Sequence, residues 1–130
     1  MSLFPLRPLG TVALINPKPP STPNAGDKVS FVPMASIDEK TGTISALQTR
    51  DFEEVSTGYT RFADGDVLFA KVTPCMENGK SAVASNLSGG LGFGSTEFFV
   101  LRPNGELDAQ FLHYFIRQTS FREQATKAMT

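Results

Sequence analysis

The first hundred residues alternate hydrophobic and polar side chains in short runs, a period of two that is typical of β-strands with one buried face. The clearest run is 67–72, which follows turn residues at 63–66. The expected strands span residues 3–15, 29–37, 43–47, 67–72, 80–87 and 97–101. Glycine, proline, aspartate and asparagine mark turns between them at 40–42, 63–66 and 103–105. The pattern therefore predicts about six short strands.

The hydrophobic period becomes helical after Asp108. Four hydrophobic residues between positions 111 and 116 are spaced to share one helical face, so a helix is expected over 109–118 with Asp108 as its N-cap. Ser120 and Glu123 have the spacing of a capping box, which predicts a second helix toward the C-terminus. Residues 50–60 predict either a short helix or an irregular link.

Strands come first and helices last, without alternation between the two. This order predicts an α+β domain, in which a twisted mixed or antiparallel sheet of short strands precedes two C-terminal helices, and it argues against a doubly wound fold. At 130 residues the chain is expected to form a single domain over 1–130. The segment "NPKPPSTPNAG" at 16–26 holds four prolines, which cannot donate hydrogen bonds to a sheet, so it predicts an extended surface loop.

Composition narrows the functional classes. The chain has one cysteine and one histidine, which excludes an intramolecular disulfide framework and leaves too few ligands for a structural zinc site. No apolar run approaches the roughly 20 residues of a membrane span. We therefore expect a cytoplasmic protein without a metal, a cofactor or a membrane partner.

Charge is unevenly distributed along the chain. The net charge of −1 argues against a non-specific nucleic-acid binder that depends on neutralising phosphates. Residues 27–66 carry eight acids and four bases, whereas residues 67–104 carry three bases and two acids. The second of these segments is therefore the better candidate for contact with DNA.

Two glycine-containing motifs suggest nucleotide binding but do not satisfy its requirements. Gly79, Lys80 and Ser81 match the end of a phosphate-binding loop, yet Pro74 stands where the first glycine is needed, and a strand rather than a helix is expected to follow. The glycines at 90–94 resemble a dinucleotide fingerprint only loosely and also lead into a strand. We interpret them as loop glycines that allow positive φ.

A nucleophilic site is the next alternative. Cys75 could act as a nucleophile with His113 as its base, although a lone cysteine is more often a small buried hydrophobic residue. Acidic residues are paired at 53–54 and at 64 and 66, in solvated or turn positions where acids are common. We therefore assign no catalytic residue.

The segment 71–80 joins two expected strands through a polar loop, and Ser95 and Thr96 enter a third strand. Lysine and hydroxyl groups suit phosphate contacts, whereas Asn, Glu and Lys can pair with base edges in the major groove. A solvated turn has a similar composition, so the residue types alone leave both interpretations open.

The order of the motifs carries more information than each motif. "SFVPMASID" is followed by "GTI", "FADGDVLFAKVTPCMENGKSAVA", "GFGSTEFFVLRP" and "FLHYFIRQTSFREQATKAMT". Together they resemble the target recognition domain of type I restriction-modification specificity (S) subunits, from about Val29 to the last residue. The resemblance implies a non-catalytic reader of double-stranded DNA. Each of two such domains in a subunit reads half of a split target, and the intervening helices dock modification subunits that bind S-adenosylmethionine.

By this resemblance, methyl transfer and cleavage belong to the modification and restriction partner subunits. The candidate DNA-contacting residues are Lys71, Thr73, Glu77, Asn78, Lys80, Ser95 and Thr96, joined by Arg50, Tyr59 and Arg61 from the preceding segment; Pro74 belongs to the same motif. The family continues beyond "KAMT" with a return strand and a long spacer helix, so the sequence looks like an incomplete recognition domain. An exposed sheet edge or the C-terminal helices would favour a homodimer. The alternative function is therefore a fragment that mediates oligomerisation or protein contacts without DNA affinity of its own.

Overall fold

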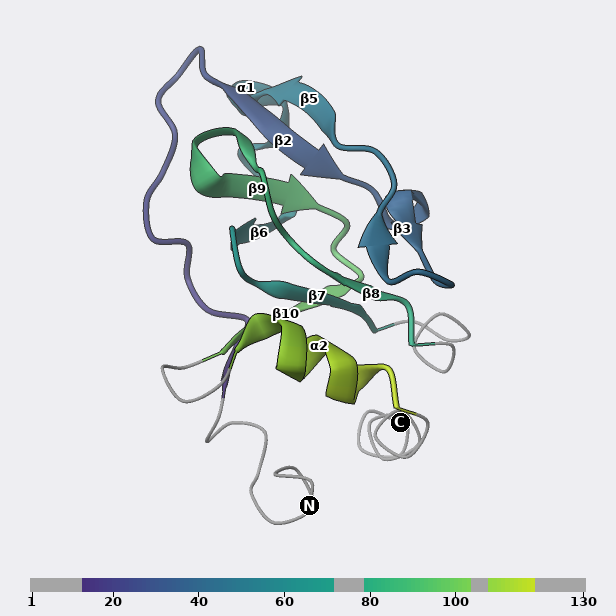
Figure 1. Ribbon diagram of the computed structural model, residues 1–130. Coiled ribbons are helices and arrows are strands. Elements are labelled where there is room, and N and C mark those ends of the chain that lie inside the picture. Colours follow the sequence, from purple (N-terminus) through teal and green to yellow (C-terminus); the bar gives the residue numbers. More distant parts are fainter. Residues whose placement is uncertain (1–12, 72–78, 104–107, 119–130) are drawn as a thin grey trace.

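The computed structural model describes residues 13–71, 79–103 and 108–118. Within them, short strands form two stacked sheets and a small hairpin, and one longer helix covers the lower sheet (Figure 1). The strands are β1 (Ala13–Ile15), β2 (Lys28–Val32), β3 (Ile37–Asp38), β4 (Thr43–Ile44), β5 (Gln48–Asp51), β6 (Thr60–Ala63), β7 (Val67–Ala70), β8 (Ser81–Val83), β9 (Leu91–Gly94) and β10 (Phe98–Pro103). The helices are α1 (Phe52–Val55) and α2 (Ala109–Ile116). The α+β prediction is confirmed.

The strand order differs from the sequence order in both larger sheets. Sheet A has the order β1-β10-β7-β8 and is antiparallel throughout. Sheet B has the order β5-β2-β9-β6, and its central pair β2 and β9 is parallel, so the sheet is mixed. Strands β3 and β4 form the separate hairpin.

The main core fills the space between the two sheets. Val32 and Phe62 enter it from sheet B, and Leu68, Phe98 and Val100 enter it from sheet A, all of them almost completely buried. Alternation along each strand sends the next residue to the opposite face. On sheet A that opposite face packs against α2 (Figure 1), which explains why β7 is buried along its whole length.

Strand β9 corrects the interpretation of the glycines at 90–94 as loop residues. Gly90 has the positive φ expected of a loop glycine, at 76°, but Gly92 and Gly94 lie in a strand at the centre of sheet B. A Cβ on Gly92 would lie 2.4 Å from Cε2 of Phe62. These two glycines therefore make room for the aromatic core between the sheets.

Other predicted boundaries shift as well. The strand expected over 29–37 ends at Val32 because Pro33 is followed by a 3-10 turn, and the strand expected over 43–47 has only two residues. Residues 50–60 contain the end of β5, the short helix α1 and the start of β6. Strand β6 was not predicted. The second C-terminal helix, residues 3–12 and the turn at 104–105 lie outside the described residues.

Helix α2 begins where the sequence predicts. The Asp108 carboxylate accepts hydrogen bonds from the backbone N–H of Gln110 at 2.6 Å and of Phe111 at 3.4 Å, which confirms it as the N-cap. Leu112 and Ile116 are fully buried against sheet A. At the other end of α2, Arg117 donates to the carbonyl groups of Glu39, Lys40 and Thr41. The helix thereby ties the β3–β4 hairpin to sheet A.

An ion pair with a buried carboxylate joins the turn between β6 and β7 to strand β10. Arg102 donates from Nε to one oxygen of Asp66 at 2.7 Å and from Nη2 to the other at 2.8 Å. The Asp66 side chain is 1% exposed and also accepts from the backbone N–H of Ala63. The same guanidinium donates to the carbonyl oxygen of Lys18 at 3.2 Å. The turn between β6 and β7 and the loop 16–26 are therefore held by one side chain.

Candidate nucleic-acid interface

Loops that carry the predicted contact residues meet at one end of the two sheets. The strand registers place the end of β9 beside the start of β6, and the end of β7 beside the starts of β10 and β8. Five predicted residues lie at or next to these termini and define what we call the loop end: Tyr59, Lys71, Lys80, Ser95 and Thr96. The loop end is at the right in Figure 1, where β7 ends and β8 begins.

Backbone hydrogen bonds fix the base of the loop end. The N–H of Lys71 donates to the carbonyl of Glu97 at 2.9 Å, and the N–H of Ser95 donates to the carbonyl of Val32 at 3.3 Å. The Ser95 hydroxyl accepts from the N–H of Glu97 at 3.1 Å, so Ser95 shapes this turn. Thr96 at the tip is exposed, and its side chain is therefore available to a ligand.

The outer face of sheet B carries two arginines held over aromatic rings. The Arg50 guanidinium lies 5.2 Å from the centroid of Phe31, and Tyr59 meets the same ring edge-on at 5.0 Å. Arg61 lies 5.3 Å from the centroid of Phe93 and donates to the carbonyl of Ser56 at 2.7 Å. Rings and hydrogen bonds restrain both guanidinium groups before any ligand arrives, which suits them to phosphate contact.

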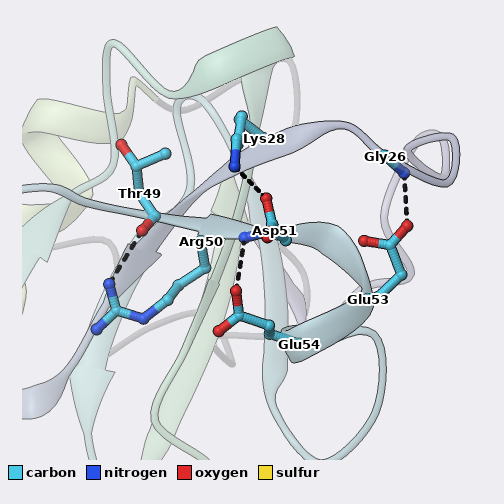
Figure 2. Close-up of polar contacts among 7 residues, drawn as sticks. All are labelled: Gly26, Lys28, Thr49, Arg50, Asp51, Glu53 and Glu54. Carbon is cyan, nitrogen blue, oxygen red and sulfur yellow. Dashed lines mark hydrogen bonds and ion pairs between the residues drawn. The ribbon is translucent and has the colours of Figure 1, made fainter.

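The opposite end of sheet B is acidic. In Figure 2, Lys28 pairs with Asp51, the N–H of Gly26 donates to Glu53, and the N–H of Asp51 donates to Glu54. The hydrogen bond with Asp51 raises the pKa of Lys28 above its ordinary value and lowers the pKa of Asp51. This end would repel a polyanion more strongly than the loop end does.

His113 is unsuited to act as a base for a cysteine nucleophile. It is buried on α2, with its Nε2 atom 3.0 Å from the Ser81 hydroxyl. That hydroxyl donates its own proton to the carbonyl of Gly79 at 2.9 Å, so it accepts a hydrogen bond from Nε2–H of the imidazole. The nitrogen that faces Ser81 is therefore already protonated. Cys75 lies outside the described residues.

The same burial makes the stability of the fold depend on the protonation of His113. Burial lowers the pKa of His113 below its ordinary value of 6.5, and the nearby positive charge of Arg117 lowers it further. The folded chain thus favours the neutral imidazole, so this contribution to stability is complete above pH 6.5 and declines as the pH falls below it. We expect the melting temperature, followed by circular dichroism, to fall between about pH 7.5 and about pH 5.5.

The matched variant for this pH experiment is His113→Gln, whose amide can donate to Ser81 without titrating. Its melting temperature should vary much less over the same interval, because His113 is the single histidine of the chain. An equal pH dependence in both proteins would refute the role of the imidazole.

Residues 13–71, 79–103 and 108–118 contain no group of three or more His, Cys, Asp or Glu side chains placed to hold a metal ion. In the same part of the chain, no helix is long and apolar enough to cross a membrane.

Comparison with known proteins finds similarity to two curated proteins. No family model matches the sequence. The specificity subunit of the type I restriction enzyme EcoEI from Escherichia coli is 38% identical over 123 residues, and that of EcoAI from the same organism is 35% identical over 123 residues. Each alignment covers 94% of this chain.

The chain is related to type I restriction specificity subunits. It spans about one fifth of the length of these two relatives, 20% and 21%. A solved chain from a study of complex assembly in a type I R-M system has a TM-score of 0.74 and 27% identity, over 92% of this chain and 30% of that one. The HsdS subunit from Thermoanaerobacter tengcongensis gives 0.74 and 26%, over 94% and 31%.

The structure of this chain, which is similar to specificity subunits, separates the predicted contact residues into three groups. The loop end brings together Tyr59, Lys71, Lys80, Ser95 and Thr96, whereas Arg50 and Arg61 extend onto the outer face of sheet B. Thr73, Pro74, Glu77 and Asn78 lie outside the described residues. Sequence reasoning missed Phe31, which supports both Arg50 and Tyr59. The alternation of residues along β2 predicts which side chains share a face with Phe31. Only the register of β2 with β5 shows that Arg50 lies beside it.

Proposed function

We propose that the chain is a sequence-reading module for double-stranded DNA in a type I restriction-modification system. One observation carries the proposal: a chain related to specificity subunits gathers its polar and cationic loop residues at one end of a rigid pair of sheets. Loops placed on a rigid scaffold are a common means of building a variable binding surface. The loop end is the surface that enters a DNA groove.

In this proposal the chain performs no chemistry. The modification and restriction subunits supply methyl transfer and cleavage, and the chain directs them to one half of a split target in the cytoplasm. The loop end combines lysines and a tyrosine, which suit phosphate contact, with the hydroxyl of Thr96, which can also hydrogen-bond to a base edge. The low net charge of −1 agrees with affinity that depends on specific contacts and is shared with partner subunits.

Selection from a pool of DNA duplexes with a randomised segment tests the proposal. The chain should enrich one short motif at low salt. Thr96→Ala should relax the preference at one position of that motif, whereas Lys71→Ala should weaken all sequences alike and reduce the salt slope by about one unit. Recovery of the pool without any preferred motif would contradict sequence reading.

Self-association is a second candidate function, favoured by one observation. Leu14 and Ile15 are 56% and 51% exposed on β1, which lies at the edge of sheet A among the described strands. Exposed apolar edge strands promote pairing between chains. Sedimentation velocity on the protein used for the selection separates the two functions: a stable dimer that enriches no motif favours self-association.

A further inference from the structure

The loop after β1 is anchored to strand β10. The N–H of Asn16 donates to the carbonyl of Val100 at 2.6 Å, and the N–H of Val100 donates back to the Asn16 side-chain oxygen at 2.9 Å. Arg102 holds the carbonyl of Lys18. Pro17 and Pro19 restrict the backbone on both sides of Lys18. The backbone of Lys18 is therefore fixed, while its side chain is exposed.

This anchored loop forms one wall of a cavity of about 370 Å³ that opens beside the start of β6 and the end of β7. Its lining residues are Asn16, Pro17, Lys18, Pro19, Thr60, Arg61, Lys71, Phe98 and Val100. The lining includes three basic residues and no acidic residue of the described chain. Because a water occupies about 30 Å³, the cavity has room for a phosphate group together with bridging waters.

The charges around the cavity are not neutralised by the ion pairs of the described residues. Those pairs are Lys28 with Asp51 and Arg102 with Asp66. The Arg61 guanidinium turns toward Phe93, and the Lys71 ammonium lies 5.4 Å from the centroid of Phe99. Arg61 and Lys71 therefore add positive potential at the rim, and Lys18 is the cation best placed to contact an anion inside the cavity.

We propose that this cavity binds a phosphodiester of the DNA backbone and that Lys18 is its contact residue. The inference rests on the proposed function and extends it to a residue outside the loops that resemble the recognition motif. Phosphate contacts fix the register and orientation of a protein on DNA. The cavity also borders Thr60 and Lys71, next to Tyr59 and the loop end, so a backbone phosphate bound in it would help to hold the duplex in register for the loop-end side chains.

An NMR titration with dimethyl phosphate, a small phosphodiester, tests the cavity without requiring a known DNA target. Dimethyl phosphate should shift the backbone amide signals of Asn16, Lys18 and Thr60, and Lys18→Ala should abolish these shifts. The matched control is Lys28→Ala, which removes the same charge at the acidic end and should leave the shifts unchanged. Weak shifts spread over many amides, or equal shifts in Lys18→Ala, would overturn the proposed site.

A salt titration with a duplex then identifies the source of the phosphate. Fluorescence anisotropy should show that Lys18→Ala lowers the slope of log affinity against log salt by about 0.9 and weakens binding about tenfold at low salt, whereas Lys28→Ala changes neither. Sequence preference that persists with an unchanged slope in Lys18→Ala would overturn the phosphate site and leave the proposed function intact. Loss of all duplex binding by the unaltered chain, with dimethyl phosphate still bound, would instead refute DNA as the occupant and DNA reading by this chain.

Discussion

Replacing Asp66 by asparagine is expected to lower the free energy of unfolding by about 3 to 5 kcal/mol. The Asp66 carboxylate is almost fully buried and accepts two hydrogen bonds from Arg102 and one from the backbone N–H of Ala63. An amide leaves the guanidinium without its counter-charge and directs an NH₂ group at another donor. A guanidinium stays protonated at neutral pH without any partner, so the charge of Arg102 persists in the variant. Urea denaturation followed by circular dichroism measures the loss.

The matched control is Asp51→Asn, which makes the same chemical change in the exposed ion pair with Lys28. Its urea midpoint should equal that of the unaltered chain, because exposed pairs contribute little. The double variant Asp66→Asn, Arg102→Gln should regain part of the lost stability, since it removes both charges. An unchanged midpoint for Asp66→Asn would show that the buried pair does not stabilise the fold.

Gly94→Ala is expected to cost about 3 kcal/mol, the upper end of the usual range for overpacking a core. The added Cβ would lie 2.5 Å from the carbonyl oxygen of Val32 and 3.2 Å from the rings of Phe62 and Phe98. Val32 lies on the neighbouring strand, so its backbone can retreat only if the parallel pair β2 and β9 separates. Chemical denaturation should show the loss as a lower midpoint with an unchanged slope.

Gly89→Ala separates this packing effect from conformational strain. Gly89 has a φ of +62° and no heavy atom within 4 Å of an added Cβ, so alanine there meets only the cost of the left-handed conformation, about 1 to 2 kcal/mol. Gly94 lies in strand conformation and meets only the steric conflict. Equal losses in the two variants would argue against a packing role for Gly94.

Local chemistry was sufficient to predict the parts of the fold that depend on neighbours in sequence. Asp108 caps α2 as expected because an N-cap requires only the two or three residues that follow it. The turn at 64–65 follows from the same kind of local signal. Strand β9 could not be predicted in this way. Its glycines are needed because a Cβ there would collide with the ring of Phe62, a residue on another strand about thirty positions earlier.

The candidate site shows the same limit. The motif order predicted Ser95, Thr96 and Lys71, and the strand registers bring them to one end. Lys18 carries no such signal, since a lysine between prolines is common in surface loops. Its place in the wall of the cavity depends on the pairing of β1 with β10 and on the guanidinium of Arg102. Contacts between residues so far apart in sequence are decided by tertiary structure alone.

The pairing of β1 with β10 also sets the order in which the chain can fold. Ala13 pairs with Pro103, so strand β1 acquires its partner only after most of the chain has left the ribosome. Closing so long a loop costs conformational entropy and is therefore slow. Sheet A is thus completed late, after residue 103 has been synthesised. The exposed Leu14 and Ile15 remain accessible throughout that interval. Slow synthesis between β1 and β10 therefore lengthens the exposure of β1 and favours strand exchange between nascent chains, whereas rapid synthesis favours the monomeric fold.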